Sequence, residues 1–142
     1  MINKHMQKAL QLARLSCDPN TKVGCVIVKD DEVLSQGCNS LPPGLNNDDY
    51  PLDCRDGAFL ETKYPYMIHG EAKAIVSACC SLQDSELYVT LFPCNECAKL
   101  IIQAGIKTIY YLDDKYDGTV ENIASKRMLR DAKVRYSKLN KD

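Results

Sequence analysis

The sequence predicts an α/β fold of three layers (α-β-α), in which helices cover both faces of a five-stranded mixed sheet. Two observations lead to this prediction. An apolar run at 23–28, a polar turn at 29–32 and an extended pattern at 33–38 indicate an opening β-hairpin. Further along, strands alternate with helices, which is typical of parallel strands joined by helical crossovers. With 142 residues, 45% of them hydrophobic, we expect one domain spanning 1–142.

The remaining elements follow from local patterns. Apolar residues recur at helical spacing from Ile2 to Ala13, and the turn Asp18-Pro19-Asn20 ends that first helix. Residues 40–65, after the hairpin, form a loop rich in proline and glycine, and loops of this length usually have a function. We then expect, in order, a helix at 69–80, a strand at 87–91, a helix at 94–103, a strand at 108–112, a helix at 122–131 and a strand at 134–139.

Composition excludes several classes of partner. The net charge is -1, from 18 basic and 19 acidic residues, so we expect no nucleic-acid polymer, which needs several phosphates neutralised. No apolar run approaches the roughly 18 residues of a membrane span, and the start of the chain lacks a cleavage site. We therefore expect no membrane contact and a cytoplasmic location, in a host cell if the protein is viral. Without a signal peptide, the eight cysteines are expected to be free thiols or metal ligands.

Two motifs that open predicted helices indicate a metal centre. These are His69-Gly70-Glu71 and the segment PCNEC, in which Cys94 and Cys97 lie three residues apart. On the first turn of a helix, that spacing points both sulfur atoms the same way. Imidazole and thiolates bind zinc, and three protein ligands leave the fourth tetrahedral position for water, as in catalytic sites. We predict one catalytic Zn²⁺ held by His69, Cys94 and Cys97.

Glu71 is the predicted catalytic residue. It lies two residues beyond the histidine, within reach of a bound water but badly placed to be a fourth ligand. Deaminating a cytosine requires attack at C4, a proton at N3 and protonation of the departing amine, and one carboxylate can move one proton among these positions. The combination of HxE with PCxxC is the known signature of zinc nucleobase deaminases.

The cysteines also allow roles other than binding a catalytic zinc ion. A structural zinc site would need a fourth ligand such as Cys79 or Cys80, which we place on the second helix facing the core. Cys17 and Cys54 lie in predicted loops and are candidates for a second metal site, for which His5 is the one spare histidine. Two further cysteines, Cys25 and Cys38, are interpreted as small apolar residues of the hairpin strands.

Five segments carry a resemblance to a known family: DPNTKVGCVIV from Asp18, GCNSLPPG from Gly37, TKYPYMIHGEAKAI from Thr62, LYVTLFPCNECAKLIIQAGIK from Leu87 and DKYD from Asp114. In these segments the chain resembles the deoxycytidylate (dCMP) deaminase family of the cytidine deaminase-like superfamily. The resemblance implies the cytidine deaminase-like fold and hydrolysis of dCMP to dUMP and ammonia, which supplies dUMP for thymidylate synthesis. It also implies a homohexamer that dCTP activates and dTTP inhibits, with Mg²⁺ accompanying the bound triphosphate effector.

The resemblance also implies residue roles. Asn39 matches the position that hydrogen-bonds the sugar, the carbonyl group of Phe92 is placed to accept from the exocyclic amine, and Gly70 keeps a backbone N–H at the substrate. Lys115 and Tyr116 lie where phosphate contacts are expected. The expected effector-site residues are Ser40, Gly44 and Lys63.

The chain departs from the family pattern at four positions. Gly70 replaces the usual alanine of HAE, Ser40 replaces the second glycine of GxNG, and Leu15 and Cys17 replace basic residues that are common before DPN. Two alternatives to dCMP deamination stay open: a deaminase of another cytosine nucleoside or nucleotide, and a non-catalytic zinc module that binds nucleotides. Glu71 favours catalysis over the second alternative, because a structural site has no need of it.

Overall fold

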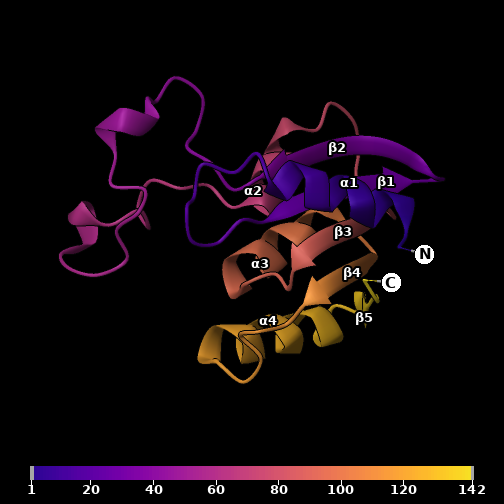
Figure 1. Cartoon of the computed structure of the whole chain (residues 1–142). Helices are drawn as coiled ribbons and strands as arrows, with labels where there is room; N and C mark the ends of the chain where they lie inside the picture. Colours follow the sequence, from indigo (N-terminus) through magenta and orange to yellow (C-terminus); the bar gives the residue numbers. More distant parts are fainter. Residues whose placement is uncertain (1, 142) are drawn as a thin grey trace.

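The computed structural model describes residues 2–141, and its centre is one mixed sheet with strand order β2-β1-β3-β4-β5 (Figure 1). Strand β1 runs antiparallel to both β2 and β3, whereas β3, β4 and β5 run parallel. The elements are α1 (Lys4–Ala13), β1 (Gly24–Lys29), β2 (Glu32–Cys38), α2 (Gly70–Ser77), β3 (Glu86–Leu91), α3 (Asn95–Ala104), β4 (Thr108–Asp113), α4 (Val120–Asp131) and β5 (Arg135–Lys138).

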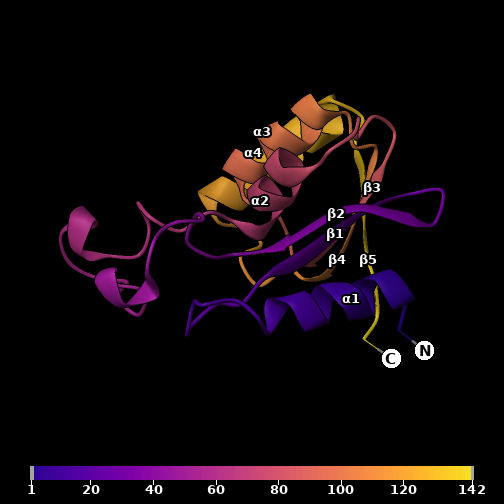
Figure 2. The same ribbon diagram turned by 90° about the horizontal axis from the view of Figure 1, so that it is seen from above.

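Helices cover both faces of the sheet. Figure 2 shows α1 on one face and α2, α3 and α4 together on the other. The predicted α-β-α fold with an opening hairpin and a five-stranded mixed sheet is therefore confirmed. Among residues 2–141, no helix combines the length and apolar character needed to cross a membrane.

The apolar sequence of β1 follows from its place between two layers. Cys25 and Ile27 pack into the core on the side of α2 and α3, whereas Val26 and Val28 pack with Met6 of α1 on the other side. Successive side chains of a strand point to opposite faces, so a strand covered on both faces is apolar at every position. The interpretation of Cys25 as a small core residue is confirmed, since it is fully buried.

The second helix ends earlier than predicted. Helix α2 stops at Ser77, because Ala78 adopts an extended backbone conformation (φ -66°, ψ 138°) that cannot continue the helix. Cys79 and Cys80 therefore lie beyond the helix and are exposed, and the expectation that they face the core is wrong. Helix α4 begins at Val120, two residues before the predicted start, where Thr119 caps it by accepting a hydrogen bond from the Asn122 N–H.

The predicted long loop forms an arm, defined here as residues 41–66, that extends away from the sheet (Figures 1 and 2). A bridge between Ser40 and Ile68 joins the two ends of the arm, with N···O distances of 3.1 and 2.8 Å. Its only helical segments are two short 3₁₀ turns, Asn47–Asp49 and Phe59–Glu61. The arm thus leaves the fold and returns next to His69.

Candidate metal centre and active-site cavity

The N-termini of α2 and α3 bring the three predicted zinc ligands together. His69 and Cys94 are the N-cap residues of these helices, and neither side chain caps its own helix, which leaves both free to bind a metal. Cys97 lies on the first turn of α3. The Nδ1 atom of His69 is 3.4 Å from the Sγ atom of Cys94 and 3.3 Å from that of Cys97.

The separations suit a zinc ion. Zinc bound at 2.0 to 2.3 Å in a tetrahedron places its ligand atoms about 3.3 to 3.8 Å apart. The three ligand atoms here lie within 4.8 Å of one another, and they form the one such group of three among residues 2–141. A second metal at Cys17 and Cys54 finds no support, because the Cys17 thiol faces Met67 and the Cys54 thiol donates to the Asp56 carbonyl.

Hydrogen bonds within the cluster shift the pKa values of all three side chains. The hydrogen bond with Cys94 raises the pKa of His69 to about 8. Hydrogen bonding with Cys97, supported by His69, lowers the pKa of Cys94 to about 4. The hydrogen bond with Cys94 and burial raise the pKa of the Cys97 thiol. Zinc binding would require thiolates at both cysteines and a neutral imidazole at His69, because only these forms bind the metal.

Glu71 lies beside this cluster, on the first turn of α2. Only 4% of the residue is exposed, and burial raises the pKa of its carboxyl group. A raised pKa makes the carboxyl group a stronger proton acceptor than an ordinary glutamate, and a buried carboxylate beside a reacting water can return the proton that it takes. Glu71 therefore has the burial and the placement that proton transfer requires.

A cavity of about 350 Å³ opens beside His69, Glu71 and Cys94. Its volume lies within the range of small-molecule sites, about 300 to 1,000 Å³. Its wall is built by residues from the α2 and α3 N-termini, the end of β3, the loop after α1, the arm and the start of α4. These residues include Asp18, Thr21, Asn39, Arg55, Lys63, Tyr64, Met67, Gly70, Phe92, Pro93, Tyr116, Thr119, Glu121 and Asn122.

Several residues predicted at the substrate line this cavity. Asn39 does so while its side chain braces the wall, accepting from the Val23 N–H at 2.9 Å and donating to the Thr21 carbonyl at 2.7 Å. Phe92 and Tyr116 also line the cavity, whereas Lys115 lines a smaller neighbouring cavity of about 210 Å³.

Gly70 lines the cavity where α2 lies closest to β2. A Cβ atom at this position would be 3.2 Å from the Cα atom of Cys38, closer than ordinary van der Waals contact. The glycine that replaces alanine of the HAE motif therefore fits a tight approach between the helix and the strand.

The three predicted effector residues lie in different surroundings. Ser40 accepts a hydrogen bond from the Lys73 ammonium group at 2.9 Å, and Gly44 lies on the arm with φ +94° and no atom within 4 Å of an added Cβ. Neither lines the two cavities described above, whereas Lys63 lines the larger one. The structure does not bring the three together in one cavity.

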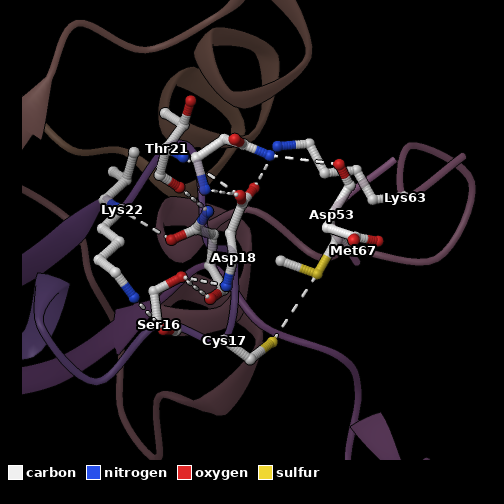
Figure 3. Close-up of polar contacts among 11 residues, drawn as sticks. Ser16, Cys17, Asp18, Thr21, Lys22, Asp53, Lys63 and Met67 are labelled. Atoms are coloured by element: carbon white, nitrogen blue, oxygen red, sulfur yellow. Dashed lines mark hydrogen bonds and ion pairs between the residues drawn. The ribbon is translucent and has the colours of Figure 1, made fainter. Parts of the chain in front are cut away.

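A buried ion pair in the cavity wall was not predicted from sequence (Figure 3). The Lys63 ammonium group lies 2.5 Å from Oδ2 of Asp18, and both side chains are almost fully buried. The other carboxylate oxygen of Asp18 accepts from the N–H groups of Asn20 and Thr21. The segment DPN signals such a turn, since aspartate commonly binds the backbone two residues on. Its partner, 45 residues away, carries no comparable signal.

Comparison with known proteins identifies the family. Residues 1–113 match the model of the cytidine and deoxycytidylate deaminase zinc-binding region. The chain belongs to this family. A probable deoxycytidylate deaminase of Caenorhabditis elegans is 40% identical over 97% of this chain and 71% of its own length. The deoxycytidylate deaminase of Homo sapiens is 39% identical over 94% of this chain and 76% of its own length.

Solved structures of named deaminases share the fold. The dCMP deaminase of cyanophage S-TIM5, in complex with dCMP and dUMP, superposes with a TM-score of 0.78 and 26% identity. The superposition covers 98% of this chain and all of that chain. A structure from work on tRNA:A34 deaminases matches less closely, with a TM-score of 0.54 over 84% of each chain.

Proposed function

We propose that this protein hydrolyses dCMP to dUMP and ammonia with one zinc ion held by His69, Cys94 and Cys97. The observation that carries the proposal is the cluster of these three side chains beside the buried Glu71, in the wall of a cavity of suitable size. Relatives that are about 40% identical over most of the chain are named deoxycytidylate deaminases, and this supports dCMP as the substrate.

The reaction adds water across the double bond between N3 and C4 of cytosine and then breaks the bond between C4 and the exocyclic nitrogen. Zinc, when bound, supplies the positive charge that lowers the pKa of the attacking water. Glu71 accepts one proton from that water and passes it to N3. It then takes the second proton from the hydroxyl group now on C4 and delivers it to the exocyclic amine, so that the C4–N bond breaks, ammonia leaves and the C4 carbonyl forms. The carbonyl group of Phe92 accepts a hydrogen bond from the exocyclic amine, while Asn39 faces the sugar and the N–H of Gly70 faces the base.

The substrate assignment is tested with the zinc-loaded protein and a panel of dCMP, CMP, deoxycytidine and dCTP. Deamination is followed by the change in ultraviolet absorbance. We expect the largest kcat/KM for dCMP. A larger kcat/KM for deoxycytidine would move the protein to another branch of the family, and zinc binding without turnover of any compound would support the non-catalytic module.

Regulation and assembly form a second part of the proposal, supported by the family resemblance. We infer a homohexamer that dCTP activates and dTTP inhibits, each bound with Mg²⁺. Exposed apolar side chains on the arm, such as Phe59 and Leu60, are consistent with contact between subunits. Light scattering on the eluting protein measures the assembly, and the panel assay repeated with 0 and saturating dCTP or dTTP measures regulation. A monomer insensitive to both nucleotides would contradict this part alone.

A further inference from the structure

We propose that Arg55, carried by the arm, binds the 5′-phosphate of the nucleotide and makes the site prefer nucleotides over nucleosides. This inference rests on the proposed function and concerns how the same cavity recognises its substrate. A phosphate that leaves water needs charge-assisted hydrogen bonds to offset its lost hydration.

The cavity wall offers few cationic groups for this task. His69 belongs to the metal cluster, and Lys63 is paired with Asp18, with only 6% and 4% of the two side chains exposed. Breaking such a buried pair to free the ammonium group would leave an uncompensated carboxylate, which is strongly unfavourable. Arg55 is the remaining cationic residue of the wall.

The guanidinium group of Arg55 is available. Arg55 is exposed, and within residues 2–141 it makes no side-chain hydrogen bond and no ion pair within 4.0 Å, although Asp53 and Asp56 are close to it in sequence. Its planar fork of N–H donors matches two phosphate oxygens at once, which an ammonium group cannot do.

The backbone beside Arg55 is tied to the cavity wall. The carbonyl group of Cys54 accepts from the N–H of Lys63 at 3.0 Å, and Lys63 in turn holds Asp18. The carbonyl group of Asp53 also accepts from the Asn20 side chain at 3.5 Å, and Figure 3 shows Asp53 and Lys63 beside the turn at Asp18. Binding therefore needs to order the Arg55 side chain but not the segment that carries it, which lowers the entropic cost.

The charge of the wall makes this arginine necessary. Glu121 also lines the cavity and is exposed, while the charge of Asp18 is balanced by Lys63. Without Arg55, the wall away from the metal cluster would carry a net negative charge and would repel a phosphate dianion.

The test compares Arg55→Ala with wild-type protein on dCMP and on deoxycytidine. We expect kcat/KM for dCMP to fall about 10- to 100-fold, mainly through KM, because a charge-assisted pair to phosphate is lost. The value for deoxycytidine should stay within about twofold, because that substrate has no phosphate. The kcat/KM for dCMP should fall less in Arg55→Lys than in Arg55→Ala, since lysine keeps the positive charge but not the planar pair of N–H donors.

Arg127→Ala is the matched control, because Arg127 is exposed on α4 and lines neither cavity. Arg127→Ala should leave kcat/KM unchanged for both dCMP and deoxycytidine. The inference would be overturned if Arg55→Ala lowered kcat/KM equally for dCMP and deoxycytidine, or lowered it for neither. Calorimetric titration of dCMP into the same zinc-loaded proteins gives a readout that does not need turnover. If the wild type binds dCMP without deaminating it, the proposed function fails, while weaker dCMP binding by Arg55→Ala would still support the phosphate contact.

Discussion

Asp18 is a buried carboxylate in the wall of the cavity, and three donor groups form hydrogen bonds to it. Burial alone would raise its pKa, but hydrogen bonds from Lys63 and from the N–H groups of Asn20 and Thr21 outweigh burial and hold the pKa below its ordinary value. Such a carboxylate stabilises the fold only while it is ionised. It joins the loop after α1 to the arm, so it also fixes the shape of the cavity.

Replacing Asp18 with asparagine tests this role. Asp18→Asn should lower the free energy of unfolding at pH 7 by about 3 to 5 kcal/mol, because Lys63 is left buried without a counter-charge. Denaturant unfolding measures this change. Asp117→Asn is the control. Asp117 is exposed and pairs with Lys126, so the substitution removes an ion pair that solvent already screens and should change the free energy of unfolding little.

The loss of stability in Asp18→Asn should depend on pH. The contribution of Asp18 is complete above the ordinary pKa near 3.8 and is lost as the pH falls through the lower pKa of the folded state. The stability difference between wild type and Asp18→Asn should therefore shrink as the pH is lowered from 5 toward the depressed pKa. A difference that stayed constant over that range would show that the Asp18 charge is not what stabilises the wall.

The cysteines provide a second test at the scale of residues. Cys94→Ser should reduce bound zinc from one ion per chain to a small fraction and abolish deamination, because serine does not offer a thiolate. Cys80→Ser should retain both, since Cys80 is exposed and lies outside the cluster. Zinc measured by atomic absorption in the two purified variants makes the comparison, and equal zinc content would refute the assignment of Cys94.

At the scale of elements, the contact between α1 and β1 depends on one glycine. A Cβ atom at Gly24 would lie 2.0 Å from the carbonyl oxygen of Ala9 and 2.6 Å from the nitrogen of Ala13. Both are backbone atoms, so no side chain can rotate to relieve the overlap. The whole helix would have to move away from the sheet.

Gly24→Ala should therefore destabilise the protein by at least about 3 kcal/mol, the upper part of the range for overpacking. Thermal unfolding followed by circular dichroism measures the loss. Gly44→Ala is the control, because Gly44 has φ +94° but open space around it, so the cost is limited to about 1 to 2 kcal/mol of backbone strain. Similar melting temperatures for wild type and Gly24→Ala would contradict the close packing of α1.

The elements show which parts of the fold can be read from sequence. The hairpin and the alternating strands and helices are predictable, because their apolar periodicity follows directly from which faces are buried. The end of α2 is not predictable in this way, since alanine is a good helix former and nothing in the local sequence marks the extended conformation of Ala78. The return of the arm to the cavity rests on pairs such as Asp18 and Lys63, which lie 45 residues apart and leave no local pattern.

In the whole molecule, the candidate active site lies where segments that are distant in sequence meet. The metal cluster lies at the N-termini of α2 and α3, beside the end of β3, and the arm and the start of α4 complete the cavity. The three candidate ligands and Glu71 were predictable from two short motifs. The place of Arg55 and the pairing of Asp18 with Lys63 were not, because both depend on how the arm folds back.

The central claim is that Glu71 moves protons in a zinc site that deaminates dCMP. The most direct measurement is ammonia release from dCMP by wild-type protein and Glu71→Gln at equal, measured zinc content. Glu71→Gln should keep one zinc ion and bind dCMP, while kcat falls by about 100- to 10,000-fold, the range for loss of a general acid–base. A Glu71→Gln protein with full zinc and near wild-type kcat would contradict the account.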